Sequence, residues 1–425
     1  MIIQREKYLR QLSAARHNGM VKVITGMRRS GKSFLLFRLF KKLLEDDGID
    51  REHIIEMAFD DFANKRFRNP EAFYSHVKSL IRDGRMHYLL LDEVQLLDDF
   101  EDVLNGFLRM DNVDVYVTGS NARFLSKDII TEFRGRGFQI HVSPLSFSEF
   151  MTVYEGSRED GWAEYLRYGG LPPVVLQPAA EDKEKVLKSL LAETYLIDIL
   201  SRNRVRNDAE LEDLLRTLAS CIGGLTNPQK LSDTFRTAKN VSVSPNTIKT
   251  YIGYFADAFL IEQALRYDVK GRKYIGTPMK YYFSDLGLRN ALLSFRQAER
   301  THLMENAIYN ELRGRGYNVD VGSVTVNGKN AEGVSVRKQL EVDFVCNRGS
   351  ERLYIQSALT LPTQEKIEQE TQSLRRIGDE FRKLVIAGDN ILPARDDAGI
   401  SYMNVFDFML GPGRGEMPRA GAGAE

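Results

Sequence analysis

Residues 26–33 read G-M-R-R-S-G-K-S and fit the pattern G-x-x-x-x-G-K-[S/T] at every fixed position. An apolar, β-rich run at 21–25 leads into this segment, and an apolar run with helical character at 34–40 follows it. A strand, a glycine loop and a helix in this order form the context that confirms a phosphate-binding loop. The sequence therefore predicts an open parallel sheet that binds a phosphorylated ligand at its carboxyl edge.

The residue types of this loop suit a polyphosphate. Glycines let successive N–H groups turn toward an anion, and the start of the following helix adds unpaired N–H groups and a positive dipole end. Lys32 is expected to reach the β- and γ-phosphates, and the Ser33 hydroxyl to hold Mg²⁺. The expected nucleotide-binding residues are Gly26, Met27, Arg28, Arg29, Ser30, Gly31, Lys32, Ser33 and Phe34.

A second nucleotide signal lies at 88–93, where an apolar run ends in two acids. Such a run is typical of a parallel strand buried on both faces. Asp92 would hold Mg²⁺ opposite Ser33, and Glu93 would orient or polarise the attacking water. Two acids after a strand can also form only a turn or a helix cap. Their position downstream of the glycine loop favours the catalytic interpretation.

Three further strands are expected in the same sheet, at 54–59, 114–118 and 138–142. After the strand at 114–118, Ser120 and Asn121 are alternative candidates for a γ-phosphate sensor; a plain turn is the competing interpretation. Before the strand at 138–142, Arg134 and Arg136 are candidates for an arginine that reaches a neighbouring subunit's γ-phosphate. A solvated basic turn is the alternative for this pair.

Composition limits the class of protein. A chain of 425 residues exceeds one hydrophobic core, so roughly two to four domains are expected. Basic and acidic residues both number 59, which gives no global argument for nucleic acid or membrane. The two cysteines, Cys221 and Cys346, have no paired spacing and suit a reducing compartment. Without a signal-like start or a membrane-length apolar run, the chain reads as soluble and cytoplasmic.

The segment at 226–291 has the pattern of a helix-turn-helix followed by a basic hairpin. Ile248, Ile252, Phe255 and Phe259 repeat at helical spacing and predict one buried stripe. This arrangement is typical of a winged helix, whose second helix often enters a DNA major groove. A spacer or protein-docking role is the alternative. The residues offered to DNA would be Asn246, Thr247, Lys249 and Thr250 on the helix and Lys270, Arg272 and Lys273 on the hairpin.

The last part of the chain has the order of elements of a restriction-endonuclease core. Helices are expected at 303–312 and 364–376, and strands at 317–321, 339–345, 351–358 and 383–387. Such nucleases hold Mg²⁺ with an Asp and a second acid and place a lysine near the attacking water.

The chemistry of this nuclease-like segment is incomplete. Asp343 would be the first acid and Glu305 an accessory one, but Gln356 and Ala358 stand where the second acid and the lysine belong. An inactive site is the favoured interpretation, because glutamine is a neutral and poorer Mg²⁺ ligand. The alternative is an active nuclease that takes the missing groups from elsewhere, with Glu332 as the nearest upstream acid.

Nearly the whole chain resembles a large prokaryotic group of predicted AAA-type ATPases. Members of that group carry a C-terminal domain of unknown function that ends like a PD-(D/E)XK nuclease. The resemblance implies a multidomain α/β protein that binds ATP. The matching segments are 5–9, 24–33, 91–93, 118–121, 134–136, 144–150, 169–172, 267–271, 280–285 and 341–345.

The resemblance divides the chain into successive parts. It implies a P-loop ATPase core with a parallel sheet at 1–150 and a small helical lid at 151–215. A winged helix at 216–295 and a restriction-endonuclease-like α/β domain at 296–410 follow. The tail at 411–425, rich in Gly, Pro and Ala, is expected to be disordered.

These parts together predict an Mg²⁺-dependent ATPase in which the nucleotide drives rearrangement of the winged-helix and nuclease-like domains. ATP and Mg²⁺ are the expected cofactors. DNA, an unidentified protein and further copies of the chain are candidate partners, and no membrane is expected. Two alternatives stay open: a DNA-binding regulator or defence-type module with ATP as a switch, and an active metal-dependent nuclease.

Overall fold

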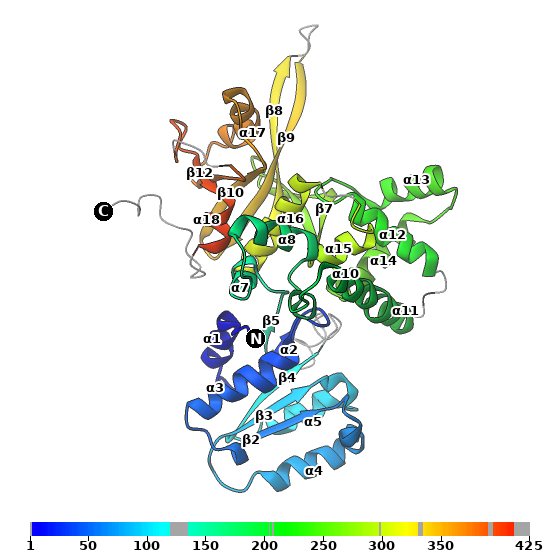
Figure 1. Cartoon of the computed structure of the whole chain (residues 1–425), viewed down its shortest axis with the longest axis vertical. Helices are drawn as coiled ribbons and strands as arrows, with labels where there is room; N and C mark the ends of the chain where they lie inside the picture. Colours follow the sequence, from blue (N-terminus) through cyan, green and yellow to red (C-terminus); the bar gives the residue numbers. More distant parts are fainter. Residues whose placement is uncertain are drawn as a thin grey trace. The chain divides into compact units, whose positions relative to one another are not determined.

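The chain forms two compact units in a computed structural model (Figure 1). The first unit comprises Met1–Pro144 with the short pieces Leu171–Pro173 and Asp257–Phe259, and the second comprises the remainder. Ser120, Asn121, Arg134 and Glu332 lie outside the described residues, as does the tail after Gly411. The structure describes residues 2–119, 135–203, 205, 208–296, 299–329, 335–389 and 394–411.

The first unit is built on a five-stranded sheet in which every pairing is parallel. The order is β2-β3-β4-β1-β5, so the strand before the glycine loop has neighbours on both sides (Figure 1, blue to cyan). The expected parallel α/β core is confirmed, and each strand lies within one residue of its predicted bounds. The strands are β1 (Val21–Thr25), β2 (Ile54–Ala58), β3 (His87–Asp92), β4 (Val113–Thr118) and β5 (Gly137–His141).

Helices cover both faces of this sheet, which explains why all residues of β1, β3 and β4 are buried. Alternate residues of β3 point to opposite layers: Leu90 packs in the layer of Leu36, and Leu91 in that of Phe73. The first layer holds α1 (Glu6–Ala14), α2 (Lys32–Phe34), the π-helical η1 (Leu35–Phe40) and α3 (Lys41–Asp46). The second layer holds α4 (Pro70–Leu80) and α5 (Phe100–Phe107).

An ion pair lies inside this sheet. The Lys22 ammonium on β1 donates to the Asp114 carboxylate on β4, and both side chains are almost fully buried. Asp114 also accepts a hydrogen bond from the Tyr116 hydroxyl at 2.8 Å and from the His17 N–H at 3.1 Å. Burial lowers the pKa of Lys22, and the carboxylate opposes that shift. These partners satisfy charges that would otherwise be costly to bury.

The second unit contains a seven-stranded mixed sheet in the order β12-β11-β10-β9-β8-β6-β7. The hairpin of β6 and β7, expected as the wing, joins this sheet through parallel pairing of β6 with β8. Residues on either side of the expected boundary at 295 therefore share one sheet. The strands are β6 (Ile261–Asp268), β7 (Lys273–Phe283), β8 (Asn318–Lys329), β9 (Ser335–Arg348), β10 (Glu351–Ala358), β11 (Arg382–Ala387) and β12 (Ser401–Asn404).

The helical segment expected as a lid, together with α7 (Phe147–Met151) just before it, shares its core with this second sheet. Phe147 on α7 meets Trp162 on α8 (Arg158–Tyr168) edge to face, with ring centroids 5.0 Å apart. Both rings join the cluster that contains Phe344 on β9 and Phe406 on α18 (Val405–Leu410). The other helices include α10 (Ala180–Ser189), η6 (Leu190–Leu196), α11 (Ile197–Asn203), α15 (Leu286–Leu292), α16 (Arg300–Gly314) and α17 (Gln364–Arg375).

The expected helix-turn-helix elements are α13 (Pro228–Lys239) and α14 (Pro245–Asp257), which follow α12 (Asp208–Ser220). Ile248, Ile252 and Phe255 are buried along α14 as predicted. The prediction is wrong for Phe259, because α14 ends at Asp257 and Phe259 adopts a left-handed backbone with φ 56°. Within the described residues, no helix combines the length and apolar character needed to cross a membrane.

Candidate nucleotide site

The glycine loop connects β1 to α2 and requires glycine at two positions. Gly26 and Gly31 have φ values of 136° and 96°, a region that L-residues with a Cβ rarely adopt. A Cβ on Gly26 would also lie 2.1 Å from the carbonyl oxygen of Val142. The motif requires glycine at these positions because the backbone must adopt positive φ and, at Gly26, pass close to Val142.

Lys32 begins α2 and is buried against the loop. Its Nζ donates to the carbonyl oxygens of Gly26 and Met27, each at 3.0 Å. Burial lowers the pKa of Lys32 to about 8, although the nearby carboxylates of Glu93 and Asp92 act in the opposite direction. The ammonium is therefore desolvated and held among carbonyl dipoles at the position where the motif places a phosphate.

Asp92 and Thr118 end the adjacent strands β3 and β4. The Thr118 hydroxyl donates a hydrogen bond to the Asp92 carboxylate, and Ser33 also hydrogen-bonds to it. Burial raises the pKa of Asp92, and these two hydrogen bonds oppose the rise. The structure thus brings Ser33 and Asp92 together, as the sequence predicts. Their role as Mg²⁺ ligands stays a prediction.

Glu93 follows β3 in a left-handed conformation with φ 50°, which is uncommon for a residue with a side chain. Its backbone N–H donates to the Thr118 hydroxyl at 3.2 Å, and its carboxylate accepts a hydrogen bond from the Gln95 amide. These contacts hold the turn that directs Glu93 away from the strand. Backbone strain of this kind is concentrated at functional sites.

Three residues that contact this site were not assigned a role from the sequence: Thr118, Gln95 and Arg5. Thr118 is the last residue of a predicted strand. Its position at the carboxyl edge of the sheet could have identified it as a residue of the site. The Arg5 guanidinium donates to the carbonyl oxygens of Ser30 at 3.4 Å and Ser143 at 2.6 Å. Arg5 belongs to segment 5–9, which carries the family resemblance. Because Arg5 is far from the glycine loop in the sequence, its contact with Ser30 could not be predicted.

The remaining predicted residues lie as follows. Met27 is buried, whereas Arg29 and Phe34 are exposed. Arg136 is exposed just before β5, and its carbonyl accepts the Val21 N–H at 2.9 Å. Arg28 is half-buried near Lys32. The sensor candidates and Arg134 fall in the undescribed segment 120–134.

The chemistry of the loop fits a bound polyphosphate with Mg²⁺. The Ser30 hydroxyl is fully buried and, in the described part of the chain, has no hydrogen-bond partner. A buried polar group without a partner marks a position where a ligand can bind. The Ser30 hydroxyl and the buried Lys32 ammonium supply donors for phosphate, beside a turn at Gly26 that has no room for a side chain. The adjacent Ser33 and Asp92 oxygens supply hard ligands for Mg²⁺.

A second charged centre lies in the second unit, where the nuclease-like acids were expected. Glu305 on α16 accepts hydrogen bonds from Lys280 on β7 at 2.9 Å and from the Tyr282 hydroxyl at 2.6 Å. Lys280 also pairs with Glu341 at 2.7 Å. Burial would lower the pKa of Lys280, but the carboxylates of Glu305, Asp343 and Glu341 outweigh it and raise that pKa.

Asp343 is buried beside this centre. Its carboxylate accepts the N–H of Ser357 at 2.8 Å, and its own N–H donates to the Gln356 side chain at 3.4 Å. Burial, reinforced by the neighbouring Glu305, raises the pKa of Asp343 to about 8. Ala358 packs in an apolar cluster. Sequence reasoning linked Asp343 with Glu305 but missed Lys280, because the lysine comes from a hairpin assigned to another domain.

Two protein families match parts of the chain. A family described as "AAA domain" matches residues 18–151, and one described as "Domain of unknown function (DUF8612)" matches residues 159–299. An uncharacterized protein of Haemophilus influenzae is 33% identical over 415 residues, covering 96% of this chain and 99% of that protein. The uncharacterized protein MJ1544 of Methanocaldococcus jannaschii is 28% identical over 341 residues, covering 76% of this chain and 71% of that protein.

Two solved structures with similar elements come from Aeropyrum pernix and Pyrobaculum aerophilum. The Orc1 protein of Aeropyrum pernix, solved in complex with DNA, has a TM-score of 0.29 and 14% identity, with 71% of this chain and 94% of that chain covered. Cdc6p from Pyrobaculum aerophilum has a TM-score of 0.29 and 13% identity, with 69% of this chain and 94% of that chain covered.

Proposed function

We propose that this chain, which belongs to the family of AAA-domain proteins with a C-terminal domain of unknown function, binds ATP with Mg²⁺ and hydrolyses it. One observation carries the proposal. The ends of β1, β3 and β4 bring a buried lysine, a hydroxyl and two carboxylates to one place beside a glycine loop. This is the set of groups that phosphoryl transfer to water requires.

Each residue has a distinct role in the proposed reaction. Lys32 would exchange its two carbonyl acceptors for phosphate oxygens, and Ser33 and Asp92 would hold the metal ion. Mg²⁺, when bound, neutralises charge on the phosphates. Glu93, held in its turn by Thr118, would orient the water that attacks the γ-phosphorus and accept a proton from it. The products are ADP and inorganic phosphate.

We also propose that the nucleotide drives a rearrangement of the winged-helix and nuclease-like parts, and that further copies of the chain contribute Arg134 or Arg136. Both parts lie in the second compact unit and share its sheet, so the proposed movement would displace that unit as a whole. The exposed position of Arg136 is compatible with a role toward a neighbouring subunit. An increase in molar mass with a non-hydrolysable ATP analogue would support assembly.

Two substitutions and two matched controls test the ATPase. Lys32→Ala should abolish ATP binding, whereas Lys42→Ala, an exposed lysine farther along the same helical segment, should leave it unchanged. Glu93→Gln should bind ATP but lose turnover, because the amide cannot accept the proton. Glu71→Gln on α4 is its control. Robust turnover by the Glu93→Gln protein would contradict the role given to Glu93.

The C-terminal centre supports the proposal that this part of the chain does not cleave nucleic acid. The Lys280 ammonium pairs with Glu305 and Glu341 and thus neutralises acids that a metal ion would otherwise need. Asp343 has a raised pKa and a neutral neighbour in Gln356. Divalent-metal-dependent DNA cleavage that disappears in an Asp343→Ala variant would overturn this proposal.

DNA binding by α14 is a second candidate function, favoured by the distribution of its side chains. Asn246, Lys249 and Thr250 are exposed, while Ile248 and Ile252 are buried on the other side of the helix. A polar face of this kind suits a DNA groove. Lys249→Glu should weaken binding of duplex DNA and reduce its salt dependence. Unchanged affinity would exclude a contact at Lys249.

A further inference from the structure

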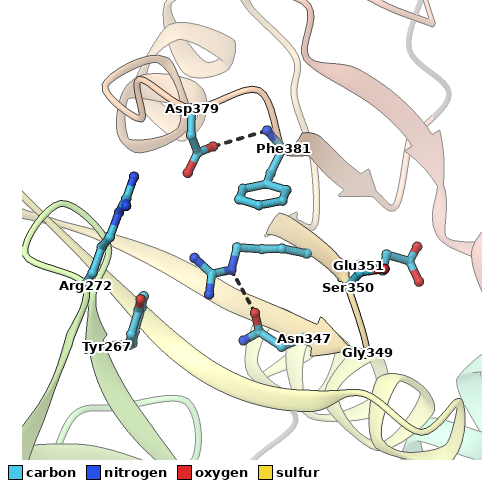
Figure 2. Close-up of a pocket in the computed structure, with 9 residues that line it drawn as sticks. Tyr267, Arg272, Asn347, Gly349, Ser350, Glu351, Asp379 and Phe381 are labelled. Carbon is cyan, nitrogen blue, oxygen red and sulfur yellow. Dashed lines mark hydrogen bonds between the residues drawn. The ribbon is translucent and has the colours of Figure 1, made fainter.

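A pocket of about 430 Å³ lies in the second unit, between the turn that joins β6 to β7 and the loop that precedes β11 (Figure 2). Its size falls in the range of small-ligand pockets, about 300–1,000 Å³. The lining residues that matter chemically are Tyr267, Arg272, Asn347, Arg352, Asp379 and Phe381. We call it the aromatic–arginine pocket. None of these residues belongs to the nucleotide site.

The wall of this pocket is a stack of flat groups. The Arg352 guanidinium lies 5.5 Å from the ring centroid of Tyr267 and 5.3 Å from that of Phe381. Its Nε donates to the Asn347 side-chain oxygen at 2.7 Å, which fixes the plane of the guanidinium (Figure 2). Tyr274 on β7 lies next to this wall, with its ring edge-to-face on Tyr267 and the ring centroids 5.4 Å apart.

Aromatic surface is left open to solvent at this wall. The Phe381 side chain is 42% exposed and Tyr274 is 61% exposed. Each ring also packs against a neighbouring ring. The ring centroids of Phe381 and Tyr354 lie 6.5 Å apart, and Tyr274 packs on Tyr267. Rings held in place by protein contacts on one side lose little entropy when a flat ligand stacks on the other.

Two basic side chains lie on the turn at the edge of the pocket, whose lining also carries two acids, Glu351 and Asp379. Arg272 and Lys273 are exposed, and neither side chain has a hydrogen bond or ion pair to the residues that the structure describes. The acids of the pocket are already engaged. Asp379 accepts from the Tyr354 hydroxyl at 2.6 Å and the Phe381 N–H at 3.3 Å, and Glu351 accepts from Arg348 at 3.0 Å.

We propose that the aromatic–arginine pocket binds single-stranded nucleic acid. One unstacked base would lie on the exposed ring of Phe381 or Tyr274, and the adjoining phosphates would contact Arg272 and Lys273. Rings and guanidinium planes that carry bases, together with basic side chains that follow the backbone, are the general means of binding single strands. A duplex keeps its bases paired and stacked, so the pocket would discriminate against it.

This proposal does not rest on ATP hydrolysis or on the duplex contact at α14, so it is tested on the full chain without nucleotide. A labelled oligothymidylate, which does not fold on itself, serves as the probe in fluorescence anisotropy. Phe381→Ala should weaken binding about fivefold or more, since stacking on one aromatic ring carries a large share of single-strand affinity. Phe381→Tyr should retain it. Phe62→Ala, an 86% exposed ring in the first unit, is the control.

The salt dependence gives an independent measurement. Arg272→Ala should reduce the slope of log K against log salt concentration by about 0.7, the value for one phosphate contact in a single strand. Arg296→Ala, an exposed arginine before α16, should leave the slope unchanged. Absence of oligothymidylate binding, or binding that neither Phe381→Ala nor Arg272→Ala alters, would overturn the proposal. Equal weakening of duplex binding by Phe381→Ala would overturn the single-strand preference.

Discussion

The hydroxyl of Thr118, at the end of β4, donates a hydrogen bond to the carboxylate of Asp92, at the end of β3. The same hydroxyl oxygen accepts the N–H of Glu93 at 3.2 Å. Thr118 therefore connects the proposed metal ligand with the proposed water-orienting residue. Its effect on activity would therefore act through these two neighbours.

Thr118→Val should lower the ATPase rate about 10–100-fold, the usual cost of losing a partner that orients a metal ligand. Loss of the donor would raise the pKa of Asp92 further, because the hydrogen bond now opposes the effect of burial. The variant should therefore require more Mg²⁺ for half-maximal rate. Thr118→Ser keeps the hydroxyl and should remain close to the parent. An unchanged Mg²⁺ requirement in the valine variant would contradict this role.

Lys32 should make the stability of the nucleotide-free protein depend on pH. Burial lowers the pKa of Lys32 to about 8 from an ordinary 10.5. Between these values the unfolded chain holds more protons at this position, so the unfolding free energy should rise with pH, by about 1.4 kcal/mol per pH unit at most. Lys32→Met should lack this rise and should be the more stable protein at pH 7. Urea unfolding across the interval, with EDTA present, measures the difference.

The buried ion pair of Lys22 and Asp114 should show strong coupling. Asp114→Asn leaves an ammonium buried without its counter-charge, which costs about 3–5 kcal/mol. Replacing both residues by apolar ones, as in Lys22→Met with Asp114→Leu, should cost much less than the sum of the single changes. Urea unfolding of the parent, Lys22→Met, Asp114→Leu and the double variant gives the coupling energy. Additive effects would show that the two charges are stabilised by other groups.

Asp343 should make the second unit less stable as the pH rises. Its pKa is raised to about 8 from an ordinary 3.8, so the folded protein holds a proton that the unfolded chain releases between these values. The unfolding free energy relative to Asp343→Asn should fall through this interval, because asparagine does not titrate. Thermal unfolding at pH 5 and pH 8, with Asp98→Asn as an exposed control, tests the direction. A constant difference would show that Asp343 is ionised throughout.

Local patterns carried the prediction of the first unit. Continuous apolar runs end in polar residues at one edge of the sheet, and each run lies within one residue of its strand, as in 114–118 and Val113–Thr118. Lys22 lies within such a run and was not singled out, because its partner Asp114 is more than ninety residues away. Long-range pairing of charges leaves no local pattern to read.

In the second unit, long-range strand pairing and side-chain contacts could not be predicted from local patterns. The hairpin at 261–283 was recognised, but parallel pairing of β6 with β8 depends on contacts across a helix and cannot be read from periodicity. Lys280 on β7 also pairs with Glu305 on α16, a contact between segments that the sequence assigned to different domains. Phe259 followed the helical spacing, yet the backbone turns before it.

The shared core of α7, α8 and the C-terminal elements has a consequence for synthesis on the ribosome. Phe147 and Trp162 emerge early, but Phe344 and Phe406, which complete their cluster, are made only near the end of translation. At ordinary elongation rates this delay lasts roughly ten seconds or more. During that time an aromatic segment stays uncovered on the nascent chain while the first unit can already fold, so this segment is where a ribosome-associated chaperone would have most to protect.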